Sequence, residues 1–285
     1  MTSNACPAEG ESIVYQVRLP VSTGTLRLVS RAVRQYRVEV RSRWRKLSDL
    51  QCAVIVLAVL RHDQRPDDLA AGYGVSGQSV RRWVIQTIAV LARQAARLDR
   101  ALHRAGRGGV QVLLLDGSCI PVQHPTGRHA AERHYCAKHK ARHLRVLTLT
   151  DQHGRLLWIS AAEPARTHET TQAKRHHIPA RLRAANAAGA DLGLICDRAH
   201  TRLDDQRDTN PTVITGRRAN RYYKLTPADI RANQLLNAER ATNEHAHAHL
   251  KNWRILTRLR HGWARRHATT LLRALLVLTN TEINR

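Results

Sequence analysis

The sequence predicts an all-α N-terminal domain followed by an α/β domain, and two observations support this division. Between residues 26 and 98, apolar side chains recur at the three- and four-residue spacing of amphipathic helices. From residue 110 onward, short apolar runs separated by turn residues alternate with helical segments. We therefore expect a helical domain at 26–102, a Gly-rich basic linker at 103–109 and an α/β domain at 110–285.

Residues 1–25 lack helical periodicity and mix Pro, Gly and Ser, so we expect a loosely ordered tail there. The segment also lacks a basic region followed by an apolar stretch, which argues against a secretory signal. The longest uninterrupted apolar run, at residues 52–60, is too short to span a bilayer. We therefore expect a cytoplasmic protein with no membrane partner.

The charge of the chain indicates its partner. It carries 47 Lys and Arg against 22 Asp and Glu, a formal net charge of +25. Such an excess repels itself unless a polyanion neutralises it, so double-stranded DNA or another nucleic acid is the leading expected partner. A GC-rich coding sequence would explain the preference for Arg over Lys, but not the excess of basic over acidic residues.

The first domain contains a core helix and a helix-turn-helix pattern. Ser48 can cap a helix that is apolar on nearly all sides. Further on, Pro66 begins a short helix, a Gly-containing turn follows at 73–75, and Ser76 can cap a longer helix. The apolar face of this longer helix comprises Val80, Trp83, Val84, Thr87, Ile88 and Leu91.

Four polar residues near the start of that longer helix point away from its apolar face: Gln78, Ser79, Arg81 and Arg82. Recognition helices use these positions to contact bases in a major groove. A solvated helix face is the alternative, and the net charge favours DNA contact.

The α/β domain has an order of elements that follows from its apolar runs. Strands are expected at residues 110–115, 144–150, 156–161, 192–196 and 212–215. Helices are expected at residues 170–187, 227–256 and 268–278. Two of the strands lead directly into an aspartate, Asp116 in VLLLD and Asp197 in LGLICD.

Asp116 and Asp197 are candidates for a metal site. Ligands of α/β sheets collect at the carboxyl ends of strands, so adjacent parallel strands would bring these two acids together. Close carboxylates repel unless a proton or cation lies between them, and Mg²⁺ prefers carboxylate oxygens. Aspartate after a strand is also a common turn residue, so a structural role remains the alternative.

A third acid would complete a two-metal site, and Glu244 is the best candidate. It lies in the helical segment NEHAHAHLKNWRIL, with Lys251 two turns later on nearly the same face. Glu239 is the rival, but it lies on another face of the helix. A solvent-facing side chain is the structural alternative for a helical Glu.

Cysteine and histidine offer no zinc motif in this sequence. Five cysteines are scattered without a CxxC pair: Cys6, Cys52, Cys119, Cys136 and Cys196. We interpret them as reduced structural residues. Three histidines, His245, His247 and His249, are spaced by two residues and so point to different helix faces. We expect them to face DNA or solvent.

Six segments, in this order, resemble the bacterial DDE transposases of the insertion-sequence-five type. They are WRKLSDLQCAVIVLAVLR with the following helix-turn-helix, LLLDGSCIPV, KHKARH, GRLLWISAAEPARTHE, LICDRAH and NEHAHAHLKNWRIL. The resemblance extends from about residue 26 to the end of the sequence. It implies a ribonuclease-H-like catalytic domain with a mixed sheet, and it assigns Asp116, Asp197 and Glu244 as the catalytic, metal-binding acids.

The resemblance also implies an activity: binding of terminal inverted repeats, cleavage of DNA with Mg²⁺ or Mn²⁺, two ions in all, and strand transfer. A homo-oligomer on the DNA is expected. Further basic residues are expected at the DNA backbone: Lys138, Lys140, His143, Lys251, Arg254 and Arg258. For Lys138, Lys140 and His143, a solvated hairpin is the alternative.

Two further positions bear on the resemblance. His168 and Glu169 stand where the family commonly has a His-Asp pair entering a helix, and we interpret them as helix-capping residues rather than metal ligands. Ala199 and His200 stand where the family usually has a Gly-Tyr pair after the second acid. This departure motivates one alternative, a catalytically decayed transposase. A separate alternative is a helix-turn-helix DNA-binding regulator without nuclease activity.

Overall fold

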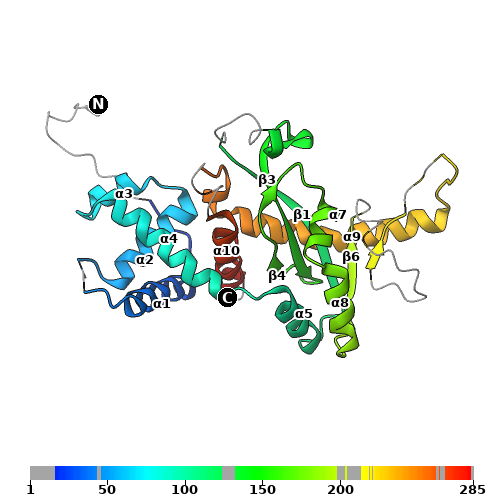
Figure 1. Ribbon diagram of the computed structural model, residues 1–285, viewed down its shortest axis with the longest axis horizontal. Helices are drawn as coiled ribbons and strands as arrows, with labels where there is room; N and C mark the ends of the chain where they lie inside the picture. Colours follow the sequence, from blue (N-terminus) through cyan, green and yellow to red (C-terminus); the bar gives the residue numbers. More distant parts are fainter. Residues whose placement is uncertain are drawn as a thin grey trace, which may run out of the picture.

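A computed structural model describes most of the chain. The described residues are 17–43, 46–123, 132–197, 203, 213–217, 219, 221–260, 263 and 267–283. Cys6, Ala199, His200 and most of the expected N-terminal tail lie outside them. Figure 1 shows a helical part, built mainly from the first hundred residues, beside a part that contains the sheet.

The N-terminal helices begin where the sequence supplies caps. They are α1 (Thr23–Glu39), α2 (Asp49–His62), α3 (Pro66–Gly72), α4 (Gly77–Gln94) and α5 (Leu98–Arg107). The side chains of Ser22, Ser48 and Ser76 each accept a hydrogen bond from a backbone N–H of the following first turn. At Ser48 the cap is reciprocal, because the Gln51 side chain accepts from the Ser48 backbone N–H at 2.9 Å.

Helices α3 and α4 follow each other with the connectivity that the sequence pattern predicts. The turn between them contains Gly74 with a φ of +60°, a left-handed conformation that glycine adopts without strain. The apolar face of α4 is buried at Val80, Val84 and Ile88, which have exposed fractions of 0%, 1% and 0%. Its polar side remains open to solvent.

The last helix of the described chain, α10 (Ala268–Ile283), packs on α4 and α1. At its end, Glu282 Oε1 accepts hydrogen bonds from the Ser22 backbone N–H at 2.8 Å and from the Ser22 hydroxyl at 2.9 Å. Trp253 is 1% exposed, and its indole N–H donates to Thr279 at 3.0 Å. One continuous core therefore extends from the N-terminal helices through α10 to one face of the sheet (Figure 1).

The sheet is mixed, as expected. Its strands are β1 (Val112–Pro121), β2 (Tyr135–Cys136), β3 (Ala141–Asp151), β4 (Leu156–Ile159), β5 (Glu163–Pro164), β6 (Gly193–Cys196) and β7 (Val213–Thr215). The order is β2-β3-β1-β6-β7, with β4 and β5 also paired to β3. Strand β1 is antiparallel to β3 and parallel to β6, and β6 is parallel to β7. The predicted α/β class is confirmed.

Helices cover both faces of the sheet, and β3 shows how side chains divide between them. Leu147 and Leu149 belong to a second core with α5, α7 (Glu169–Arg175) and α8 (Ile178–Ala187). Thr148 and Thr150 point to the other face, where both hydrogen-bond to side chains of α9 (Pro227–Lys251). Alternation along a strand thus places polar groups under α9 and leucines under α5 and α8.

Several expected boundaries differ in the structure. The helix expected at 170–187 is two helices, because His177 between them has a left-handed φ of 52° and Pro179 follows in the first turn of α8. The helix expected at 227–256 ends at Lys251, and a short 3₁₀ turn, η3 (Arg254–Leu256), follows. The stretch expected to be a linker is helical as far as Arg107.

The strand expected to end before Asp116 continues to Pro121, because its antiparallel pairing with β3 runs the whole way. The two-residue strands β2 and β5 were too short to be predicted by alternation. Within the described stretches, no helix combines the length and apolarity needed to cross a bilayer.

Candidate active site

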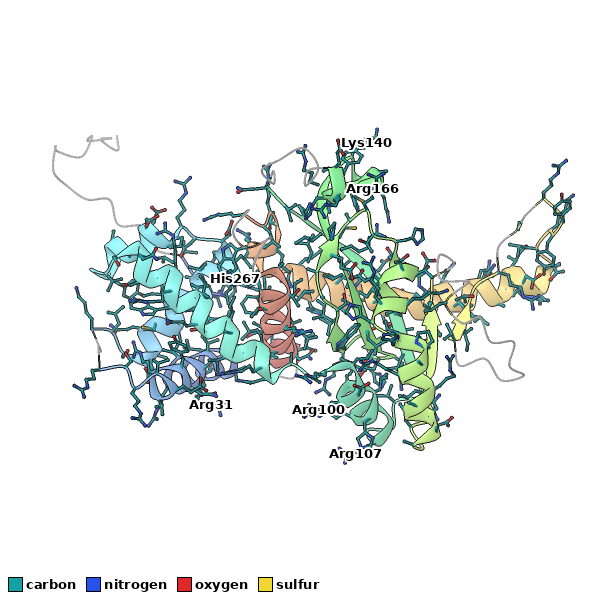
Figure 2. The ribbon with its side chains drawn as sticks, in the orientation of Figure 1. Arg31, Arg100, Arg107, Lys140, Arg166 and His267 are labelled. Carbon is teal, nitrogen blue, oxygen red and sulfur yellow. The ribbon has the colours of Figure 1, made fainter. Side chains whose placement is uncertain are left out.

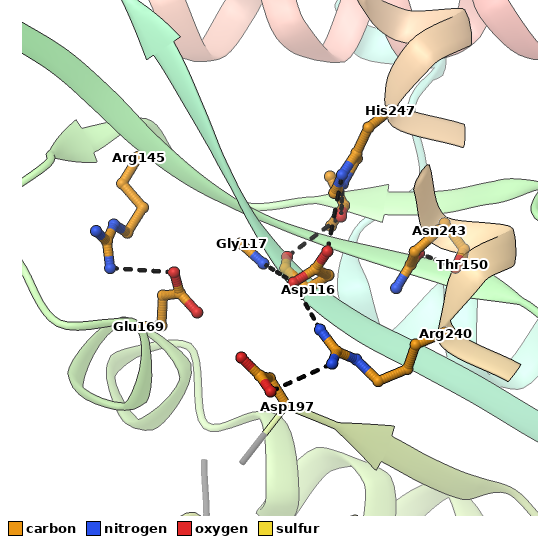
Figure 3. Close-up of polar contacts among 10 residues, drawn as sticks. Asp116, Gly117, Arg145, Thr150, Glu169, Asp197, Arg240, Asn243 and His247 are labelled. Atoms are coloured by element: carbon orange, nitrogen blue, oxygen red, sulfur yellow. Dashed lines mark hydrogen bonds and ion pairs between the residues drawn. The ribbon is translucent and has the colours of Figure 1, made fainter. Parts of the chain in front are cut away.

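Asp116 and Asp197 lie side by side at the edge where β1 and β6 stop pairing. The parallel register of these strands ends at Leu115 and Cys196; Asp116 is the next residue of β1, and Asp197 directly follows β6. Parallel pairing therefore brings two carboxylates, far apart in the sequence, to one edge of the sheet (Figure 3). The Asp116 side chain is fixed further by the backbone of its own strand, since Gly117 N–H donates to its Oδ1 at 2.9 Å.

Arg240 of α9 bridges the two aspartates. Its Nη2 lies 3.5 Å from Asp116 Oδ1, and its Nη1 lies 3.2 Å from Asp197 Oδ1. The side chains of Arg240 and Asp116 are each 22% exposed, so the bridge is only partly screened by water. Two carboxylates that flank one side chain repel each other unless a cation lies between them, and the guanidinium of Arg240 supplies that positive charge.

His247 and Thr148 hold the other side of Asp116. His247 Nδ1 lies 3.8 Å from Asp116 Oδ2, while its Nε2 is 2.7 Å from the Thr148 hydroxyl. Burial lowers the pKa of His247, and the nearby Asp116 carboxylate opposes that shift. His247 is therefore neutral at pH 7 and occupies a buried polar position, which corrects the expectation that it faces DNA or solvent.

Glu244 lies on the same side of α9, one helical turn after Arg240. Its side chain is exposed, and its charge raises the pKa of His247, so the carboxylate lies near the site. The three acids do not form a tight cluster: among the described residues, Asp116, Asp197 and Glu244 are not a group whose ligand atoms all lie within 4.8 Å of one another. The structure brings two acids together and leaves the third beside them.

Glu169 is a fourth carboxylate close to Asp116, but it lies on the opposite face of β1, next to Gly117. It begins α7, pairs with Arg145 at 3.1 Å and points toward the strand ends (Figure 3). The preceding residue, His168, is the N-cap of α7 but makes no side-chain capping hydrogen bond, which corrects the capping interpretation. A Cβ added at Gly117 would lie 2.5 Å from the Glu169 carboxyl carbon, so glycine at this position makes room for Glu169.

Sequence reasoning missed Arg240, His247 and Glu169 as residues of the site. For the first two a signal existed, because residues 240, 244 and 247 have the spacing of one helix face. For Glu169 the signal was its family position, which we interpreted as helix capping, whereas its ion pair depends on how α7 packs against β3.

The residues predicted to contact DNA are mostly at the surface. Exposed side chains include Gln78, Arg81, Arg82, Lys138, Lys140, Lys251, Arg254 and Arg258, and Ser79 is half-buried. His143 differs: it is 6% exposed, its Nδ1 lies 3.2 Å from the Ala141 carbonyl, and its ring stacks on His139. Direct phosphate contact by His143 does not fit this burial.

The comparison with protein families bears on residues 115–280, which match the model described as DDE superfamily endonuclease. The chain belongs to the DDE superfamily of endonucleases. The matched stretch is more than half of the chain and contains Asp116, Asp197 and Glu244. No curated protein and no solved structure matches the chain. The mixed sheet with its helices fits an α/β nuclease-like domain, and DNA is the substrate that the family implies.

The family also implies the use of divalent metal in general. The residues of this endonuclease fit that requirement in two respects. Asp116 and Asp197 supply hard carboxylate oxygens, the donors that Mg²⁺ and Mn²⁺ prefer. The guanidinium of Arg240 between them shows that the position stabilises positive charge.

Proposed function

We propose that this DDE endonuclease is a transposase, which binds terminal inverted repeats, cuts DNA at them and transfers the cut strand to target DNA. The observation that carries the proposal is the pair of carboxylates where the parallel pairing of β1 and β6 stops, with Arg240, Glu244 and His247 of one helix across from them. Such a convergence of acids suits metal-dependent phosphodiester cleavage.

Asp116, Asp197 and Glu244 are the proposed ligands of two Mg²⁺ or Mn²⁺ ions. Bound there, the metal would lower the pKa of an attacking water and neutralise the leaving oxygen, so no covalent protein intermediate is required. Glu244 reaches the aspartates by rotation of its exposed side chain, because it already lies one turn from Arg240 on the same side of α9.

Arg240 and His247 have separate roles in this proposal. The guanidinium of Arg240 leaves the gap between the aspartates when the acids are ligands, and it is then placed to bind a phosphate oxygen of the DNA. His247, a buried residue of α9, stays neutral. Together with Thr148 it holds Asp116 in its orientation. Neither residue transfers a proton in this scheme.

The DNA is bound by two surfaces in the proposal. Lys138, Lys140 and Lys251 contact the backbone near the acids, where Lys251 lies close enough to His247 to lower its pKa. The exposed residues of α4 contact the terminal repeats through a major groove. There Arg81 also pairs with Asp67 of α3, so one cation of this helix is oriented before DNA arrives. Cutting two ends in one complex makes a homo-oligomer on the DNA part of the proposal.

The decisive experiment measures nicking of duplex DNA that carries the terminal repeats, with Mg²⁺ or Mn²⁺. Wild type is compared with Asp116→Asn, Asp197→Asn and Glu244→Gln. Glu239→Gln is the matched control, since Glu239 is an exposed glutamate of the same helix on a different face. The proposal requires that cutting depend on the metal and on all three acids but not on Glu239.

A non-catalytic DNA-binding protein is the second candidate, favoured by the guanidinium of Arg240, which already pairs with both aspartates. In that case wild type binds the repeats without nicking them at any metal concentration. Arg240→Ala then distinguishes a metal site that the guanidinium blocks from the absence of any metal site. Removal of the guanidinium would allow metal to bind the aspartates only if the site is blocked.

A further inference from the structure

A second cluster of potential metal ligands lies on the opposite face of β1 from Asp116. Cys119 of β1, Cys136 of β2 and His139 of η1 (Ala137–His139) present two sulfur atoms and an imidazole nitrogen, all within 4.8 Å of one another. Cys119 pairs across the sheet with Arg145, whereas Asp116 pairs with Thr148 under α9. The two sets of ligands are therefore separated by the strand itself.

The chemistry of this cluster differs from that of the acids. Thiolate sulfur and imidazole nitrogen select Zn²⁺, whereas carboxylate oxygen suits Mg²⁺ and Mn²⁺. We propose that Cys119, Cys136 and His139 bind Zn²⁺ and that this ion fastens the β2–η1 segment to β1. This proposal goes beyond the interpretation of Cys119 and Cys136 as reduced structural cysteines.

Burial and charge around the cluster support three protein ligands with one open position. Cys136 is 4% exposed, Cys119 is half-buried and His139 is exposed, so the fourth position faces water. Burial and the neighbouring Cys136 thiol raise the pKa of Cys119, so metal binding must release its proton. Three cationic side chains lie near His139, those of Lys138, Lys251 and Arg145. Two thiolates cancel the charge of Zn²⁺, so the bound ion adds no net positive charge to repel these side chains.

The segment that the ion would fasten is joined to the sheet by a short strand pairing. Strand β2 has two residues, paired with Arg142 and Ala141 of β3, and a strand this short gains little from pairing alone. An ion that joins β1 to β2 links residues 119 and 136 of the chain. It therefore lowers the conformational entropy of the state in which β2 is detached from the sheet. If the proposed function is correct, the same ion positions Lys138 and Lys140, and Figure 2 shows Lys140 projecting with Arg166 at this end of the molecule.

The test is titration of the reduced, metal-free full-length chain with Co²⁺ in excess Mg²⁺. Cobalt bound to thiolate absorbs visible and near-ultraviolet light, so the spectrum reports sulfur ligation directly. We expect about one Co²⁺ per chain, released by equimolar Zn²⁺. Cys119→Ser and His139→Ala should each weaken binding at least roughly tenfold, whereas the control variants Cys52→Ala and His245→Ala should retain it.

Two outcomes would overturn the zinc site. One is the absence of thiolate absorption in reduced wild type. The other is a Cys119–Cys136 disulfide found by mass spectrometry in protein isolated without reductant, with no metal bound after reduction. If Cys136→Ser fails to fold, Cys119→Ser still decides, because its residue is only half-buried. Asp116→Asn must leave the Co²⁺ spectrum intact, so the zinc site and the nuclease proposal can fail independently.

Discussion

The two faces of β1 carry opposite kinds of chemistry within four residues. Asp116 faces α9, among Arg240, His247 and Thr148, where every contact involves charge or a hydrogen bond. Cys119 faces the α7 side, beside Arg145, in a cluster of thiols. The alternation of a strand lets one segment supply a hard-donor site and a soft-donor site that do not compete for the same ion.

The largest expected difference between the two faces concerns DNA cleavage. Asp116→Asn should lower the rate of nicking on the order of 10³-fold or more, because it removes a ligand without changing the shape of the side chain. Cys119→Ser should cause a much smaller loss, since it changes only the attachment of β2. Single-turnover nicking assays measure both, and equal losses would contradict the separation of the two sites.

Gly117→Ala tests how closely Glu169 of α7 approaches β1. A methyl group there would meet the Glu169 carboxyl, which Arg145 holds in place. We expect a loss of about 1–3 kcal/mol in the free energy of unfolding, measured by urea denaturation. The double variant Gly117→Ala with Glu169→Ala should recover most of it; additive losses would show that Glu169 is not the obstacle.

The lysines beside each face should contribute similar and smaller effects. Lys140→Gln on the cysteine side and Lys251→Gln on the α9 side should each reduce the slope of log affinity against log salt by about 0.9. Fluorescence anisotropy with labelled repeat DNA over a range of salt concentrations measures this slope. A change for Lys251→Gln alone would show that Lys140 does not contact the DNA.

The smallest expected effect is on the pH dependence of folding stability, and it concerns only the face of β1 that carries Asp116. Burial lowers the pKa of His247, so its neutral form is favoured in the folded state. Its contribution to stability is complete above the ordinary histidine pKa of 6.5 and is lost as the pH falls toward its lowered folded pKa. His247→Gln should therefore lose less stability than wild type between pH 7.5 and 5.5 in urea titrations. His176, whose pKa burial also lowers, keeps part of the dependence in the variant.

The sequence allowed the backbone positions of the two aspartates to be predicted better than their surroundings. Apolar runs before Asp116 and Asp197 indicated strands, and the rule for parallel strands was enough to place both acids at one edge. Arg240 shares a helix face with Glu244, but the spacing alone does not show that an arginine in so basic a protein pairs with the two aspartates. Cys119 and Cys136 escaped notice, since their approach depends on the curl of β2 and β3 over β1.

The domain division shows the same limit in another form. Helical spacing identified α2, α4 and α10 one by one, because burial of an apolar face is a local pattern. No pattern indicated that α10 would complete the core of the N-terminal helices, since that contact joins residues at opposite ends of the described chain.

The bond between Ser22 and Glu282 also bears on how the molecule is made. During synthesis on a ribosome, the N-terminal helices emerge long before α10, so they must wait with an apolar side uncovered. Contacts so distant in sequence form slowly, because the intervening chain must first be brought into place. The N-terminal helices therefore complete their core only after the sheet-containing part of the chain has been translated.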